Sequence, residues 1–334
     1  METRKVQRTG GSTYTVSLPK EWARANDVEA GDRIRFHDED DRLVLRPHHD
    51  ESQTTGVFEV GDREGEVELT RVVITMYVSG FDEIRLTGDR LTAEQRQIIR
   101  QATQGLIGLE IIEETPDQVV LQDLFDSPEL SIENAIDRMQ LVALTMVRDA
   151  ITALIDGNVD LASDVIDRDD DVDRLWFMVS RIFRSVLRDP VPSKTVDLDR
   201  ETVFDYQSGA RQLERVADHA TKIAGVAREI DAVPPAISDD LDALETAATD
   251  LCETAMAALL EEDLETATRQ AESVLDRLAD IDDSARSISN AIVDLDDPQR
   301  AQRLGLVVDS LTRTADYGGN VAESALLRAA PRPE

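Results

Sequence analysis

The second half of the chain contains the same pattern twice, and this duplication limits the possible folds more than any other feature. Residues Leu213–Ala224 and Leu311–Ala322 align at an offset of 98 positions. Residues Val165–Asp173 and Val274–Asp282 align at an offset of 109. The 11-residue difference falls in the connection around residues 190–200, where an insertion costs little free energy. We therefore predict a tandem duplication of a three-helix bundle.

Helix-breaking residues divide this half of the chain into six predicted helices between residues 131 and 328. The breaks lie at residues 156–158, 189–192, 233–235, 261–263 and 296–298. They contain Gly, Pro, Asp and Asn, which end or begin helices. The predicted bundles span residues 131–233 and 236–330.

Acidic residues four positions apart recur in both copies. Glu214 and Asp218 emerge from one side of a predicted helix, at the edge of an apolar stripe, while His219 is expected on the outer face. Two like charges beside an apolar surface cost free energy unless a cation or a proton neutralises them. With 69 acidic residues in 334, one such pair is weak evidence, but its recurrence at matching places strengthens it. These acids are Asp167, Asp171, Glu214 and Asp218 in the first copy and Asp276, Asp280 and Asp316 in the second.

These motifs resemble the PhoU family of phosphate-uptake regulators. Residues Leu213–Ile223 are close to that family's signature, and Arg313–Ala322 is its second copy. The resemblance implies that the seven acids listed above bind a divalent metal or an iron cluster. Thr312 replaces the acid that matches Glu214, although Asp309 and Glu323 share its face. Oxygen ligands suit Mg²⁺, Mn²⁺, Ca²⁺ or iron, and a multinuclear site would accept phosphate as a bridging ligand.

Residues 1–49 differ from the rest of the chain in charge. They hold nine basic and nine acidic residues, so the formal net charge of −33 comes entirely from residues 50–334. Short alternating strands and a helix that begins after Pro19 are predicted here. Residues Ser17–Glu21 and Val28–Asp32 resemble the AbrB-type swapped-hairpin DNA-binding domain, whose fold interleaves two chains into one small β-barrel. The resemblance implies a homodimer and the DNA contacts Arg4, Lys5, Arg8, Lys20 and Arg24. A neutral dimerisation module is the alternative.

Residues 57–125 predict a small α+β domain that connects the two parts. Strands are expected at residues 57–60, 81–86, 109–112 and 118–121, and helices at 66–78 and 91–106. We find no Ser/His/Asp set and no glycine-rich phosphate loop in this segment, so an enzyme is not expected. Three roles of this domain fit the pattern, which are a spacer between the two parts, a ligand sensor and a dimer contact. The linker residues His48 and His49 either bind a metal or are simply solvated.

The composition favours a cytoplasmic protein. Its single cysteine, Cys252, excludes an internal disulfide, and no apolar run is long enough to enter a membrane. The acidic charge and the preference for arginine, with 32 Arg and 4 Lys, resemble proteins of salt-loving archaea.

The sequence as a whole predicts a multidomain, mainly α protein with an N-terminal swapped-hairpin β-barrel and a small α+β domain. We expect a cytoplasmic homodimer that binds DNA and regulates phosphate uptake and homeostasis. The alternative is an adaptor that does not bind DNA and docks on a phosphate ABC transporter or a signalling kinase. A di-iron oxidase is disfavoured, because it requires Glu-x-x-His ligand pairs that the bundles do not contain.

Overall fold

The structure is a computed structural model that describes residues 3–11, 13–39, 42–47, 54–61, 64–124, 131–188, 198–230 and 233–331. Two compact units, Met1–Gln53 and Thr54–Glu334, make up the chain. His48 and His49 lie outside the described residues. No helix in the described part of the chain is both long and apolar enough to cross a membrane.

The N-terminal unit consists of two hairpins and one short helix. Strands β1 (Gln7–Thr9) and β2 (Thr13–Thr15) pair antiparallel, as do β3 (Ile34–Glu39) and β4 (Arg42–Pro47). Helix α1 (Lys20–Ala25) lies between the hairpins in sequence and starts after Pro19, as predicted.

The hairpins of this unit do not close into a barrel within the described residues of one chain. None of its described side chains is buried, and its apolar residues Val6, Tyr14, Val16, Phe36 and Leu43 are all more than half exposed. Exposed apolar surface of this extent calls for a partner. The predicted barrel would therefore need a second copy of the chain.

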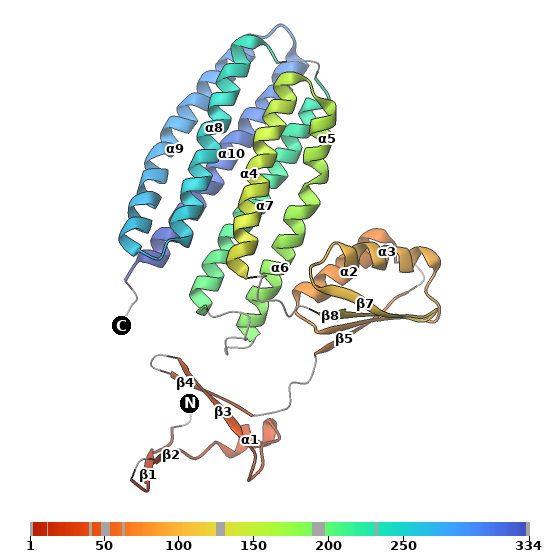
Figure 1. Ribbon diagram of the computed structural model, residues 1–334, viewed down its shortest axis with the longest axis vertical. Helices are drawn as coiled ribbons and strands as arrows, with labels where there is room; N and C mark the ends of the chain where they lie inside the picture. The colour runs from red at the N-terminus through yellow and green to blue at the C-terminus, as the bar shows by residue number, and fades with distance from the viewer. Residues whose placement is uncertain are drawn as a thin grey trace. The chain divides into compact units, whose positions relative to one another are not determined.

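The first part of the larger unit is an α+β domain with a four-stranded sheet of order β5-β6-β8-β7. The strands are β5 (Thr55–Glu59), β6 (Glu83–Thr87), β7 (Leu109–Glu114) and β8 (Gln118–Asp123). Helices α2 (Glu66–Val78) and α3 (Ala93–Gln104) cover one face of this sheet (Figure 1). Thr92 and Gln95 form the capping box of α3.

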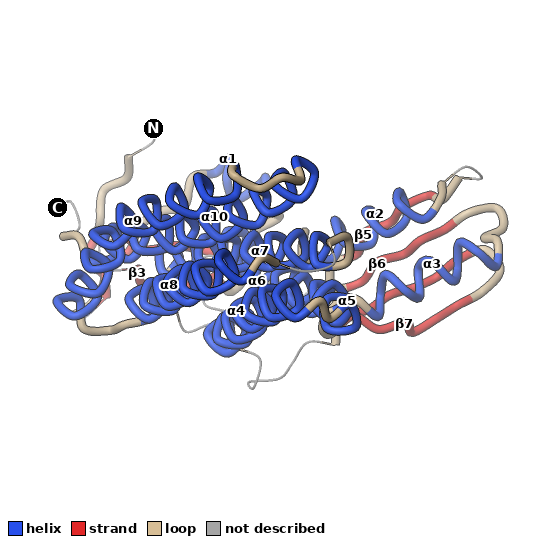
Figure 2. The backbone as a smooth tube through the Cα atoms, turned by 90° about the horizontal axis from the view of Figure 1, so that it is seen from above, coloured by secondary structure: helices blue, strands red, loops and turns tan. Residues whose placement is uncertain are grey.

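The rest of the larger unit is helical and forms two bundles side by side (Figures 1 and 2). The first contains α4 (Ile132–Asp156), α5 (Val159–Asp167), α6 (Asp169–Arg188) and α7 (Arg200–Ala227). The second contains α8 (Pro235–Leu260), α9 (Leu264–Val293) and α10 (Pro298–Ala329). One apolar core runs through both bundles, with α7 packed against α10. This confirms the predicted mainly α class with tandem bundles.

Local sequence signals account for most of the helix ends. Ser131, Asp199, Asp263 and Asp297 each accept a backbone N–H bond at the start of a helix. Gly157 ends α4 in the left-handed conformation, with φ of 63°. The predicted second helix differs from the structure, because it breaks at Arg168 into α5 and α6. The Arg168 guanidinium lies 2.5 Å from Asp149 and 3.0 Å from Asp164.

Arg181 of α6 ties the α+β domain to the first bundle. Its guanidinium donates hydrogen bonds to the carbonyl oxygens of Tyr77, at 2.6 Å, and Phe81, at 3.1 Å. It also pairs with the Asp123 carboxylate, and both side chains of this ion pair are nearly buried. Three acceptors from the α+β domain therefore converge on one cation from the bundle.

We predict that Arg181→Met lowers the free energy of unfolding by about 3 kcal/mol, because it leaves the Asp123 charge and two carbonyls without their donor. Arg184→Met is the matched control, since Arg184 is exposed on the same helix. Its effect should stay within about 0.5 kcal/mol. Urea unfolding followed by circular dichroism measures both variants, and equal effects would contradict this role for Arg181.

Candidate functional site

Helices α6 and α7 form a seam along which side chains pair in antiparallel order. Asp169, Asp173 and Trp176 are spaced i, i+4, i+7 on α6, so they share one face. On α7 the residues that interact with them are Asp218, Glu214 and Arg211. We call the four acids Asp169, Asp173, Glu214 and Asp218 the carboxylate cluster.

Burial and mutual repulsion raise the pKa values of three members of the carboxylate cluster, Asp169, Asp173 and Glu214. The pKa of Asp173 rises from its ordinary value of 3.8 to about 7. Burial is the main cause, followed by the negative charges of Asp169, Glu214 and Asp218. Burial and the charge of Asp218 also raise the pKa of Asp169. The cluster therefore favours any proton or cation that neutralises it.

Glu214 is the most constrained member of the cluster. One of its oxygens, Oε1, accepts a hydrogen bond from Arg211 at 2.6 Å, whereas Oε2 is buried without a hydrogen-bond partner. Burial raises the pKa of Glu214, and the positive charge of Arg211 opposes this rise. A buried carboxylate oxygen without a partner is costly, so this atom is available to a ligand.

Arg211 connects the carboxylate cluster to the next layer of the seam. Its guanidinium lies 5.2 Å from the centre of the Trp176 ring, within the range of a cation–π contact. One turn further along, Ser180 of α6 and Gln207 of α7 line a common groove. The seam thus contains acids at one end and an aromatic-lined groove beyond Arg211.

Two of the four ligands predicted in the first bundle belong to this cluster. Glu214 and the exposed Asp218 lie in it, whereas Asp167 and Asp171 are exposed outside it, and Asp171 lies 3.9 Å from Arg174. Asp169 and Asp173, which the sequence did not single out, are the acids of α6 that interact with Asp218 and Glu214 of α7. Their i, i+4, i+7 spacing with Trp176 was the available sequence signal.

Two family models match parts of the chain. Residues 136–227 match the PhoU domain, and residues 7–53 match the antidote-toxin recognition domain of the bacterial antitoxin MazE. The first match covers most of the first bundle, which is therefore similar to the PhoU domain. All four acids of the carboxylate cluster lie inside this match, and the N-terminal hairpins lie inside the other.

A solved PhoU structure shares the fold of the helical half. PhoU from Pseudomonas aeruginosa has a TM-score of 0.52 and 21% sequence identity, covering 60% of this chain and 96% of that one. A second solved structure is the phosphate transport system regulatory protein PhoU from Streptococcus pneumoniae. Its TM-score is 0.49 and its sequence identity is 19%, and the alignment covers 58% of this chain and 91% of that one. No curated protein sequence matches the chain.

The second bundle does not reproduce the carboxylate cluster. At the places that match Asp169 and Glu214 it has Leu278 and Thr312. The predicted ligands Asp276 and Asp280 are exposed, and Asp316 pairs with Arg313 at 3.1 Å. The PhoU domain that matches the family model therefore contains the stronger candidate site.

The acids of the cluster interact through their charges but do not yet form a coordination shell. Among the residues that the structure describes, no group of three or more His, Cys, Asp or Glu side chains is placed to hold a metal ion. Metal binding at the cluster would therefore require side-chain movement, with Glu214 exchanging Arg211 for the ion.

His219 is buried, contrary to the prediction that it lies on the outer face. It is 9% exposed, and its Nε2 atom lies 3.3 Å from the hydroxyl of Tyr317, the residue that matches it in the second copy. The second bundle covers this face of α7, which a single-helix pattern does not reveal. Burial lowers the pKa of His219, and the charge of Lys222 lowers it further.

The five predicted DNA contacts are all exposed. Lys20 and Arg24 lie on α1, and Arg8 on β1 donates a hydrogen bond to the Gly11 carbonyl at 2.6 Å. Arg4 and Lys5 lie in the segment before β1. Their side chains are accessible to a polyanion, and nothing in the described structure blocks such a role.

We predict that Asp173→Asn stabilises the metal-free protein above pH 7. The pKa of Asp173 is raised in the folded state, so its ionisation opposes folding. The contribution of Asp173 to the free energy of unfolding of the wild-type protein falls as the pH rises from about 4 to the folded pKa of about 7, and it then stays constant. Partial exposure screens the effect, which leaves about 1–2 kcal/mol. Thermal unfolding at pH 5 and pH 8, in chelator, measures the difference. An equal effect at both pH values would show that Asp173 is already ionised at pH 5.

Proposed function

We propose that the chain is a DNA-binding regulator of phosphate uptake and phosphate homeostasis. In this proposal the N-terminal unit dimerises and binds operator DNA, and the PhoU domain senses phosphate status. The carboxylate cluster is the observation that carries the sensing role, because Asp169, Asp173 and Glu214 have raised pKa values and Glu214 Oε2 has no hydrogen-bond partner.

The donor atoms of the cluster suit a hard cation. Asp169, Asp173, Glu214 and Asp218 offer only oxygen atoms, which Mg²⁺, Mn²⁺ and iron accept. A bound ion would supply positive charge that neutralises the acids and an open position for phosphate. Arg211, once released from Glu214, would be free to pair with the same anion.

The N-terminal unit supports dimerisation on physical grounds. Its exposed apolar residues, among them Tyr14 and Phe36, have no core within one chain. A second copy of this neutral segment would bury them without the repulsion that the acidic helical half would bring. The basic side chains of both copies would then face the same DNA.

Metal content tests the sensing role. We predict that the full chain, purified at physiological salt and loaded with Mn²⁺, retains the ion after desalting, and that Glu214→Gln loses most of it. Asp280→Asn is the matched control, since it removes an exposed acid from the second bundle and should retain the ion. Elemental analysis gives the stoichiometry. Equal metal content in all three proteins, or none in wild type, would remove the cluster from the proposal.

Gel-shift experiments test the DNA-binding role, with DNA from upstream of phosphate-transport genes. Because the chain carries a net charge of −33, we predict weak binding at low salt and retained or stronger binding at high salt, opposite to the usual slope. Arg24→Ala should weaken binding, whereas Arg228→Ala, an exposed arginine of the bundle, should not. Absence of a shift at every salt concentration would favour the adaptor that docks on a transporter or a signalling partner.

A further inference from the structure

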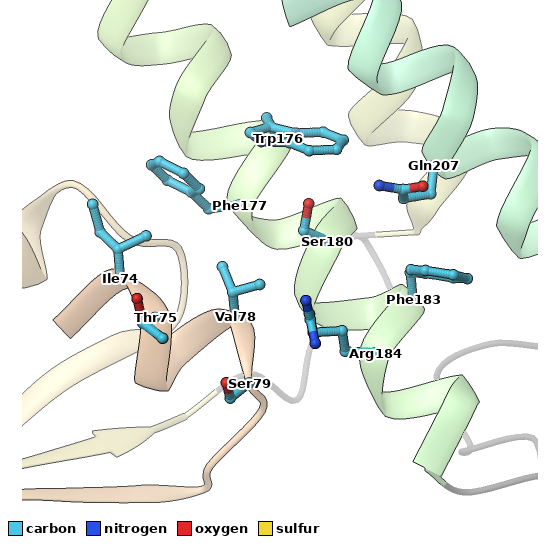
Figure 3. A pocket seen from close by; sticks show the side chains of 10 residues that line it. All are labelled: Ile74, Thr75, Val78, Ser79, Trp176, Phe177, Ser180, Phe183, Arg184 and Gln207. Carbon is cyan, nitrogen blue, oxygen red and sulfur yellow. The ribbon is translucent and has the colours of Figure 1, made fainter. Parts of the chain in front are cut away.

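The groove between the α+β domain and the first bundle is large enough for a small organic molecule. It has a volume of about 490 Å³ and is lined by residues of α2, α6 and α7 (Figure 3). Pockets for small ligands commonly measure about 300–1,000 Å³. It belongs to neither the carboxylate cluster nor the DNA contacts.

Aromatic and aliphatic side chains form the walls of the groove. Trp176 and Phe183 pack against the core of the bundles, whereas Val78 and Phe177 pack against the core of the α+β domain. The groove therefore lies where the two apolar cores meet. Flat aromatic walls favour a ligand with a planar aromatic body, which stacks on them.

Two polar side chains in the groove face each other across the α6–α7 seam. Ser180 is 8% exposed, and its hydroxyl has no hydrogen-bond partner. Gln207 is half-buried on the facing helix, and Figure 3 shows both side chains among the aromatic ones. A buried hydroxyl without a partner is uncommon in native proteins, so it indicates a missing polar ligand atom.

Arg184 supplies the charge at the edge of the groove. Its guanidinium lies beside Val78 and Ser79 in Figure 3, and none of the ion pairs found in the described structure uses it. A cation at the edge of an apolar groove favours an anionic group on the ligand.

We propose that this groove binds a small organic anion with a planar aromatic body, of the size of a mononucleotide. The aromatic ring stacks on Trp176 and Phe177, polar atoms at its edge meet Ser180 and Gln207, and its phosphate or carboxylate pairs with Arg184. The α+β domain, which the sequence left without a role, then serves as one wall of a ligand site.

Trp176 gives a direct readout of this binding. The chain has two tryptophans, and Trp22 lies in the N-terminal unit, so the full-length Trp22→Phe protein reports on Trp176 alone. The protein is titrated in chelator with three probes, which are AMP, phenylacetate and inorganic phosphate, and the fluorescence is excited at a wavelength that only tryptophan absorbs. Chelator removes metal from the carboxylate cluster, so failure here and failure of the proposed phosphate sensing are separate results.

We expect saturable fluorescence changes with AMP, phenylacetate or both, and none with inorganic phosphate. The probe that binds more tightly identifies a nucleotide or an aromatic acid as the source. Arg184→Glu should weaken binding at least about tenfold, the loss expected for one charge-assisted contact. Arg138→Glu, at an exposed position on α4, makes the same charge change outside the groove and should bind like the parent.

Gln207→Leu is a second test that adds no charge, and it should weaken binding several-fold while the circular dichroism spectrum stays unchanged. The proposal is overturned if neither aromatic anion gives a saturable change. It is also overturned if Arg184→Glu binds as tightly as Arg138→Glu, or if inorganic phosphate alone gives the same response.

Discussion

Repulsion among four carboxylates in the seam between α6 and α7 is the constraint on which the proposed mechanism depends. Burial and repulsion together raise the pKa of Asp173 to about 7. A shift of this size is a cost to folding with the acid ionised. The helical half can bear that cost because α7 is packed on several sides, by α4 and α6 in its own bundle and by α10 in the other. Helices α6 and α7 therefore remain packed together although the carboxylates between them repel one another.

Helix α6 connects every functional element of the larger unit. Its first turns carry Asp169 and Asp173, its middle carries Trp176, and Arg181 then binds the α+β domain. The Arg211 guanidinium contacts both Glu214 and the Trp176 ring. One side chain, that of Arg211, therefore lies between the carboxylate cluster and the groove. This arrangement gives a physical route between two sites, and it needs no large motion of the bundles.

The sequence predicted most of the elements, because their signals are local. Helix α2 has its predicted bounds, Glu66–Val78, and the Gly and Pro breaks separate the helices where expected. The sequence did not predict the break at Arg168, because residues 159–188 contain no Gly or Pro. It also did not predict the interaction of Asp169 and Asp173 with α7, and the metal ligands named from the repeat stay a prediction. The prediction that His219 lies on the outer face was wrong, because the apolar pattern of one helix does not show how one bundle packs on the other.

In the proposed mechanism a cation replaces a proton in the carboxylate cluster, and calorimetry measures this exchange. The metal-free full chain is titrated with Mn²⁺ at pH 7 in two buffers that differ in ionisation enthalpy. Because the pKa of Asp173 is about 7, we predict that binding at pH 7 releases about half a proton per ion, and that Asp173→Asn releases none. Binding without proton release, or the same release from Asp173→Asn, would contradict it.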